Sequence, residues 1–262
     1  PGMDSQKTNS YGMKVFHSFD GFELQSYTSS TDTNVIFSYD ADWGNTDSHF
    51  PYVYDYFSET LRDRKSFNQE FRAVSDSADF QKNSFFEWVI GANYLELKES
   101  NLKKDDGLYG DPSDPYGPYA SASASSSKYK SSNFSVFGNL DYLLSASLKF
   151  SIGLRWEDWE ADYSDSLQES FNPTDKMSGG KISLIKNMTN DTNMYASLAK
   201  GYKQGGFNLG LGLDANATNK NLAYDPEFLT NYELGINTKL LDSRITFNGV
   251  LFYSDREDQQ VL

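Results

Sequence analysis

The sequence predicts an all-β protein of about ten antiparallel strands that follow one another up and down. Three observations support this fold class. Apolar and polar residues alternate with a period of two in many segments, the connections between those segments are alternately short and long, and aromatic residues gather near the ends of the apolar runs. Because successive side chains of a strand point to opposite sides, each strand has one apolar and one polar side.

The clearest alternation lies in residues 148–157, LKFSIGLRWE, where every second residue is large and apolar. The residues between them are Lys, Ser, Gly, Arg and Glu, so the other side of this strand is polar. The same period predicts the remaining strands. The ten predicted strands cover residues 11–18, 22–39, 64–75, 84–99, 131–143, 147–161, 176–187, 193–203, 229–240 and 244–257.

The connections distinguish a barrel from a sandwich. The short connections are residues 18–21, 75–83, 143–147, 187–193 and 240–244, and the long ones are residues 40–63, 100–130, 162–175 and 204–228. An up-and-down barrel in an outer membrane has this asymmetry, with short periplasmic turns and long extracellular loops. A sandwich has no reason to place every long connection at one end. The loop 100–130 is rich in Asp, Gly, Pro, Ser and Tyr, so we expect it to be partly disordered.

Composition excludes several classes of function. The 262 residues carry a formal net charge of -14, which argues against nucleic-acid binding because phosphate contacts need clustered Lys and Arg. The chain has no cysteine and two histidines, so a thiolate nucleophile and a thiolate or histidine-rich metal site are not expected. No apolar run reaches the roughly 18 residues of a transmembrane helix. The first ten residues do not resemble a signal peptide, and both ends resemble cuts within a longer chain.

The alternation alone fits either of two environments. In a membrane barrel the apolar side faces lipid and the polar side a wet lumen, whereas in a soluble β domain the apolar sides meet in a core. Aromatic residues at strand ends favour the membrane, because such residues form girdles at the two interfaces. The expected girdle residues are Trp88, Tyr142, Trp156, Tyr202 and Tyr253.

Candidate binding residues lie in one predicted loop and on the predicted lumen side. The segment 43–57, WGNTDSHFPYVYDYF, is rich in rings that can stack on a flat ligand such as a catecholate or a sugar; packing of the loop on itself is the alternative. Arg155 and Lys203 are candidates to contact a ligand in the lumen. The complete candidate set is Trp43, His49, Tyr52, Tyr54, Tyr56, Arg155 and Lys203.

Catalysis and metal binding are not predicted. Glu157 and Asp158 are adjacent on a strand and therefore point to opposite sides, so they cannot act as a carboxylate pair. Four aspartates between residues 105 and 114 offer oxygen ligands for Ca²⁺, but their spacing matches no EF-hand and favours a solvated acidic loop. We therefore expect no enzyme activity, no cofactor and no metal.

Several segments, in order along the chain, resemble the β-barrel of TonB-dependent outer-membrane receptors. They include SFNQEFRAVSD at 66–76, FFEWVIGANYLE at 85–96, GLRWED at 153–158 and, most distinctively, NMYASLAKGYKQGGFN at 193–208. The resemblance implies that residues 1–262 are part of a larger 22-stranded barrel domain, about ten strands of it, without the plug domain and TonB box of these receptors.

The resemblance also implies a function. These receptors sit in the outer membrane of Gram-negative bacteria and import scarce ligands, most often ferric siderophores, with energy delivered by TonB. The expected partners are membrane lipid, the ligand and the TonB complex, the last through the missing N-terminal region, and the expected state is a monomer. A passive porin-like barrel and a soluble, secreted, carbohydrate-binding β protein remain as alternatives.

Overall fold

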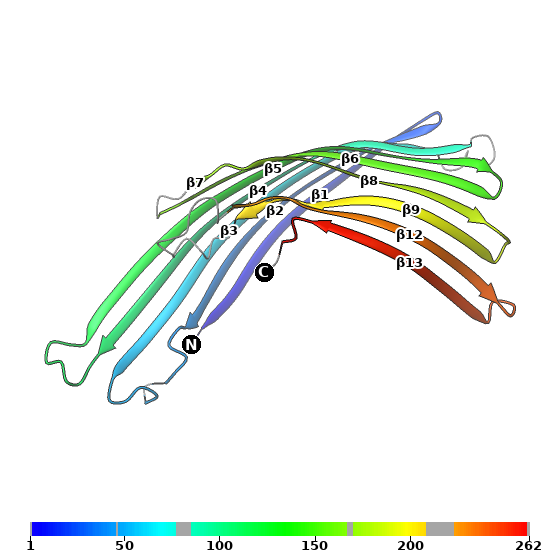
Figure 1. The fold of residues 1–262 in the computed structure, drawn as a ribbon. Helices are drawn as coiled ribbons and strands as arrows, with labels where there is room; N and C mark the ends of the chain where they lie inside the picture. The colour runs from blue at the N-terminus through cyan, green and yellow to red at the C-terminus, as the bar shows by residue number, and fades with distance from the viewer. Residues whose placement is uncertain (1, 46, 77–84, 167–169, 208–222, 261–262) are drawn as a thin grey trace.

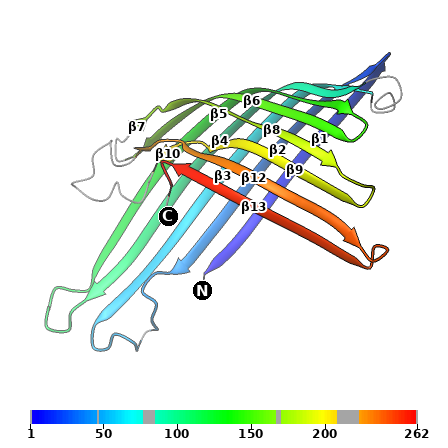
Figure 2. The ribbon, with the colours of Figure 1, turned by 45° about the vertical axis from the view of Figure 1, so that its right-hand side comes forward.

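The computed structural model describes residues 2–45, 47–76, 85–166, 170–207 and 223–260, which form one curved antiparallel sheet (Figures 1 and 2). The described part of the chain contains strands and turns and no helix able to cross a membrane. The all-β, up-and-down prediction is therefore confirmed. In both views the sheet is open, and β1 and β13 form its two edges.

Ten strands pair in the order β1-β2-β3-β4-β5-β6-β8-β9-β12-β13, each antiparallel to the next. The short strand β7 pairs with β6, and β10 and β11 form a separate two-stranded ribbon. The bounds are β1 Met3–Phe19, β2 Phe22–Asp40, β3 Val53–Ser75, β4 Phe86–Gly110, β5 Tyr119–Ser145, β6 Leu148–Asp165, β7 Ser170–Phe171, β8 Thr174–Asn187, β9 Thr192–Lys203, β10 Gly206–Phe207, β11 Ala223–Tyr224, β12 Glu227–Leu240 and β13 Ile245–Glu257.

Two of the predicted long loops are wrong in extent. Residues 100–130 form a hairpin in which β4 continues to Gly110 and β5 begins at Tyr119, so the expectation of partial disorder is also wrong. The predicted loop 40–63 shrinks to residues 41–52, because β3 begins at Val53. These extensions carry no large apolar side, as in SASASSSK at 121–128, so they lack the alternation that marks a strand in lipid.

Cross-strand polar contacts accompany the backbone ladder in these extensions. The Ser58 hydroxyl donates to Asp105 Oδ1 at 2.6 Å, and Lys104 Nζ lies 3.6 Å from Glu59 Oε1. The expected alternation of short and long connections survives in part: β1 and β2 are joined by two residues, of which Gly21 takes a φ of 83°. Much of the predicted connections 75–83 and 204–228 lies outside the described residues.

The outward side of the sheet is a single, uncovered apolar layer. Ile90, Leu154 and Leu251 keep 60%, 62% and 73% of their surface exposed, and no second layer covers them in the described part of the chain. A soluble β domain would bury these side chains, because removing apolar surface from water stabilises a fold by roughly 25 cal/mol for each Å². Exposure of such a layer is what a lipid-facing barrel wall requires.

An aromatic border closes the apolar band, and charged residues lie beyond it. Tyr94 pairs with Phe134, whose ring meets Trp156 edge-on at 6.5 Å between centroids. Two residues past Tyr94 on the same side, Glu96 binds Lys98 Nζ at 2.6 Å. This change from rings to ion pairs marks a membrane–water interface.

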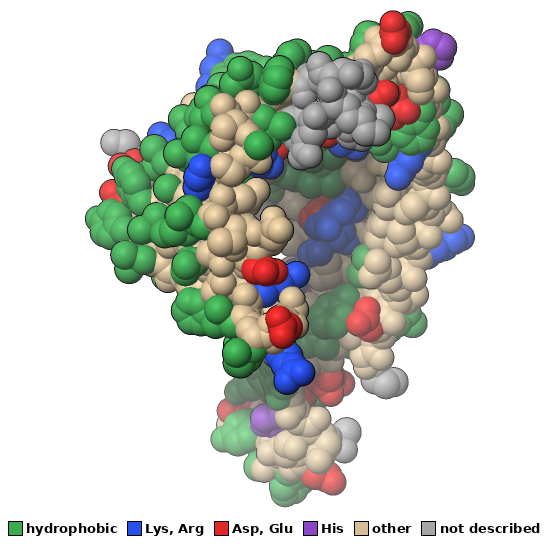
Figure 3. Space-filling view, turned by 90° about the vertical axis from the view of Figure 1, so that its right-hand side faces the viewer, with side chains coloured by type: hydrophobic (Ala, Val, Ile, Leu, Met, Phe, Trp, Pro, Cys, Tyr) green, Lys and Arg blue, Asp and Glu red, His purple; other side chains and the backbone are tan. Residues whose placement is uncertain are grey.

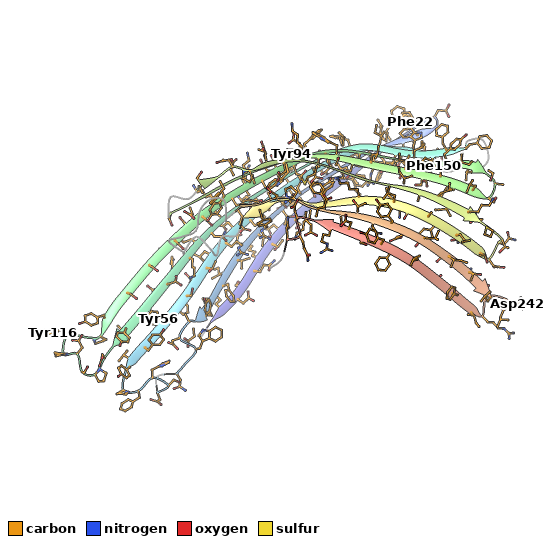
Figure 4. All side chains as sticks on the ribbon, in the orientation of Figure 1. Phe22, Tyr56, Tyr94, Tyr116, Phe150 and Asp242 are labelled. Atoms are coloured by element: carbon orange, nitrogen blue, oxygen red, sulfur yellow. The ribbon has the colours of Figure 1, made fainter. Side chains whose placement is uncertain are left out.

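The opposite side of the sheet is polar and lines a hollow. Figure 3 shows charged side chains inside this hollow, while hydrophobic side chains gather on the outer surface. In Figure 4, Tyr56 and Tyr116 lie at one end of the sheet and Asp242 at the other. The inward side therefore offers water-exposed polar groups along the whole wall, as a barrel lumen does.

Charge on the two sides should have unequal costs. Leu154→Arg places a cation in hydrocarbon and should destabilise the intact protein by roughly 2–4 kcal/mol, falling with distance from the bilayer centre. The matched variant Ser151→Arg, three residues away on the inward side of β6, should cost under about 1 kcal/mol. Urea titration of the protein folded into vesicles measures both. Equal losses would contradict the assignment of the two sides.

Candidate functional site

The inward side is organised around Glu157 on β6, which is 7% exposed. Its Oε2 accepts hydrogen bonds from Arg155 Nε at 2.8 Å and from the Tyr202 hydroxyl at 3.0 Å. Its Oε1 accepts one from Asn133 Nδ2 at 2.7 Å. Both carboxylate oxygens are thus satisfied, and the network ties β5, β6 and β9 together. Because the buried carboxylate is paired with a cation and fully hydrogen-bonded, it holds these three strands in a fixed relative position.

An apolar cluster supports this network. Trp159 and Met177 are each 1% exposed and pack with Ala161, and Tyr202 and Phe228 pack against them. The Trp159 indole Nε1 donates to Ser131 Oγ at 2.9 Å, so the buried ring leaves no unsatisfied donor. Arg155 therefore projects from a rigid base, with its side chain 41% exposed.

The position of Tyr202 corrects the prediction. The alternation placed it with Leu198 in an outward girdle, but its hydroxyl binds Glu157 and also accepts from Arg155 Nε at 3.2 Å. The β8–β9 ladder ends at Gly180 and Lys200, two residues before Tyr202. The Tyr202 ring then lies against Gly179, where an added Cβ would meet it at 3.1 Å.

A second charged cluster lies further along the inward side, between β3 and β4. Arg64 Nε donates to Glu99 Oε2 at 2.7 Å, and Arg62 Nε lies 3.6 Å from Glu99 Oε1. Arg62 also donates to Asn101 Oδ1 at 2.8 Å. Two guanidinium groups share one carboxylate, so this cluster carries one surplus positive charge. Both arginine side chains are about half exposed, which leaves donors for a ligand.

Sequence reasoning missed this cluster and Tyr202. Arg62 lay in the predicted loop 40–63, and Glu99 was the last residue of a predicted strand. The period-two pair Arg62 and Arg64 was a usable signal, since two such residues on one strand share a side. The sequence holds no comparable signal for Tyr202, because the alternation along its strand places it on the same side as the outward Leu198.

The aromatic residues of segment 43–57 divide between a loop and a strand. Trp43 is 87% exposed and has a φ of 59°, and His49 and Tyr52 belong to the same loop. Tyr54 and Tyr56, predicted in the loop, lie in β3. Tyr54 nevertheless connects the two parts, since its ring centroid lies 4.9 Å from His49 and 4.7 Å from Tyr56.

Asp42 fixes this loop to β3. Its Oδ1 accepts from the Gly44 amide at 2.8 Å, and its Oδ2 accepts from the Tyr56 amide at 3.0 Å. These backbone donors favour the charged form and lower the pKa of Asp42 below its usual value. A lowered folded-state pKa means that the contact persists above the ordinary Asp pKa and is lost only as the pH falls through the folded value.

The predicted binding residues do not form one site. Register places Arg155 level with Phe137, Gly91 and Arg72 on successive strands. Tyr56 lies sixteen positions from Arg72 on β3, on the order of 50 Å away at ~3.3 Å per residue. Lys203 is the exposed last residue of β9, beside Tyr202 and opposite Glu227. Arg155 and Lys203 thus lie toward the apolar band, and the five aromatic residues lie at the far end of the extended strands.

Among the described residues, no group of three or more His, Cys, Asp or Glu side chains lies close enough together to hold a metal ion. Asp105, one of the four aspartates considered for Ca²⁺, instead accepts from Ser58 and pairs with Lys103 Nζ at 2.9 Å. Asp106 follows it on the strand and therefore points to the opposite side.

Comparisons with known proteins agree on the fold. Residues 3–262 match the family described as "TonB dependent receptor-like, beta-barrel". Among solved structures, the ferric yersiniabactin uptake receptor FyuA from Yersinia pestis is similar, with a TM-score of 0.66, 17% identity, and coverage of 98% of this chain and 37% of that chain.

Two further solved structures are similar to this chain. The siderophore receptor PiuA from Acinetobacter baumannii has a TM-score of 0.65 and 16% identity, with coverage of 96% of this chain and 41% of that chain. The copper transporter OprC has a TM-score of 0.62 and 15% identity, with coverage of 91% and 38%. The chain thus spans about two fifths of the length of these proteins.

The length of the match, the single up-and-down sheet and its two unlike sides all point to one kind of protein. TonB-dependent receptors lie in the outer membrane of Gram-negative bacteria, which accounts for the lipid-facing outward side. This chain belongs to the β-barrel of the TonB-dependent receptor family.

Proposed function

We propose that the intact protein acts as a monomeric receptor that takes up a ferric siderophore across the outer membrane with energy from TonB. This chain supplies part of the barrel wall and part of the ligand-capturing surface. The observation that carries the proposal is the inward surplus of positive charge at Arg62 and Arg64, set between the aromatic residues at the strand tips and the Arg155 network.

The chemistry of a ferric siderophore matches both features. Such a ligand holds iron through oxygen atoms, often on flat catecholate rings, and many of these complexes are anionic. The exposed ring of Trp43 and the Tyr54–Tyr56 pair offer stacking surfaces for a flat ring. A guanidinium with free donors then attracts the negative oxygens, although the chain as a whole is acidic.

The arrangement suggests an order of contacts along the wall. The aromatic group lies at the far end of the extended strands, the arginine cluster follows, and Arg155 and Lys203 lie nearest the apolar band. A ligand captured at the tips would meet a second and a third set of polar groups on its way inward. The relatives named above support siderophore uptake, and the copper transporter among them shows that this fold also serves other cargo.

Uptake of iron-55 tests the proposed function. Cells lacking the intact gene should lose accumulation of iron-55 supplied with a catecholate, a hydroxamate or a carboxylate siderophore, and the plasmid-borne gene should restore it for at least one of the three. Inactivation of TonB should abolish the restored uptake. Uptake that persists without TonB would instead show a passive pore, and restoration with none of the three would refute siderophore transport.

Charge removal at Arg62 tests the capture surface. Arg62→Gln leaves the closer Arg64–Glu99 pair intact and should weaken siderophore affinity by about 10- to 150-fold, because a charge-assisted hydrogen bond contributes roughly 1.5–3 kcal/mol. Lys65→Gln removes the same charge from the outward side, where Lys65 pairs with Asp32, and should leave affinity unchanged. Isothermal titration calorimetry of both purified variants measures the siderophore affinity of each. Equal affinities in the two variants would argue against a role for Arg62.

A further inference from the structure

The outward side of β4, β5, β6, β8 and β9 contains an open groove within the apolar band. Register aligns one residue from each of five strands in a row across it, with glycines on both sides of Leu154. The row runs Ile90, Gly138, Leu154, Gly180 and Lys200. Leu154 therefore projects between two positions that have no side chain.

The groove follows β8. Ser178 and Gly180 form its floor, Leu154 and Trp156 of β6 form one wall, and Leu198 of β9 forms the other. A Cβ at Gly180 would lie 2.9 Å from Leu154 Cδ2 and 2.5 Å from the Gly153 carbonyl oxygen. No larger residue therefore fits at position 180 unless the backbone shifts. The whole groove, which continues past Leu154 over Gly138 to Trp88 and Ile90 of β4, has a volume of about 1070 Å³, slightly above the roughly 300–1,000 Å³ of small-molecule sites.

Lys200 stands at one end of this groove. Its side chain is exposed, its Nζ lies 4.9 Å from the centre of the Phe228 ring, and within the described ranges no carboxylate pairs with it. Lysines near a membrane interface direct their ammonium toward the head groups while the stem stays in apolar surroundings. An ammonium in this position attracts an anionic head group.

We propose that this groove is a binding site for one phosphate-bearing anionic lipid. The acyl chain lies along β8 over Ser178 and Gly180, between Leu154 and Leu198, and the phosphate binds Lys200. Because the groove faces the hydrocarbon of the membrane, a lipid acyl chain is available to fill it. The positive charge of Lys200 favours an anionic head group. The site is separate from the inward surface, so it does not depend on which ligand is transported or on how transport is energised.

Lipid binding by the intact receptor tests the proposal. In native mass spectrometry from detergent, the protein should retain one phosphatidylglycerol in preference to phosphatidylcholine. Lys200→Gln should lower phosphatidylglycerol affinity about fivefold, given roughly 1 kcal/mol for each interfacial cation, and leave phosphatidylcholine binding unchanged. Ser178→Leu fills the groove with an apolar side chain and should weaken retention of both lipids.

The matched control is Lys65→Gln, which removes an outward lysine that is already paired with Asp32. It should retain phosphatidylglycerol as the unmodified protein does. Heat-modifiable gel mobility confirms that each variant is folded. Unchanged phosphatidylglycerol affinity in Lys200→Gln, an equal loss in Lys65→Gln, or no preference between the two lipids in the unmodified protein would each overturn the proposal.

Discussion

The structure depends on one constraint: each strand separates hydrocarbon from water, and no water is available on the hydrocarbon side to satisfy the backbone. Every N–H and C=O in the apolar band must therefore pair with a neighbouring strand. The continuous antiparallel ladder from β1 to β13 meets this requirement within the sheet. At β1 and β13 each strand has one neighbour in the described sheet, so in the membrane their outer edges require further pairing.

The same constraint explains why the two sides can be so different in composition. Outward residues need only be apolar, and Leu251 and Ile90 accordingly keep more than half of their surface exposed. Inward residues carry the specific interactions, such as the complete satisfaction of Glu157 and the shared carboxylate of Glu99. Where β2 to β5 leave the apolar band, both sides become polar, and rings and arginines can be presented to water without cost to the membrane-embedded part.

The sequence predicts the part of the fold that lipid imposes. All ten strands were identified where an apolar side alternates with a polar one, as in residues 148–157. Prediction failed beyond the band, because residues 119–130 consist only of Ser, Ala, Lys and Tyr and show no large apolar side, although they pair with β4 in a continuous ladder. When a strand shows no alternation of apolar and polar side chains, a single sequence does not distinguish it from a loop.

The candidate site was only partly predictable for a related reason. Arg155 and the ring-rich segment 43–57 stand out by residue type, but their separation along the strands depends on the register of four strands. Tyr202 turned inward because the β8–β9 ladder ends before it, which is a tertiary feature that parity cannot show. Arg62 and Arg64 meet Glu99 because β3 and β4 continue past the apolar band, and no alternation in the sequence marks that continuation.

The central claim is that successive residues of one strand meet alternately lipid and water. These 262 residues contain no cysteine, so single cysteines can be placed and spin-labelled at each position of residues 148–157 in the intact protein in vesicles, with any cysteine elsewhere in it replaced by serine. Collision with oxygen, which concentrates in hydrocarbon, should peak at the even-numbered positions, and collision with a water-soluble nickel chelate should peak at the odd-numbered ones. Profiles without this period of two, or with the chelate reaching both sets equally, would contradict the account.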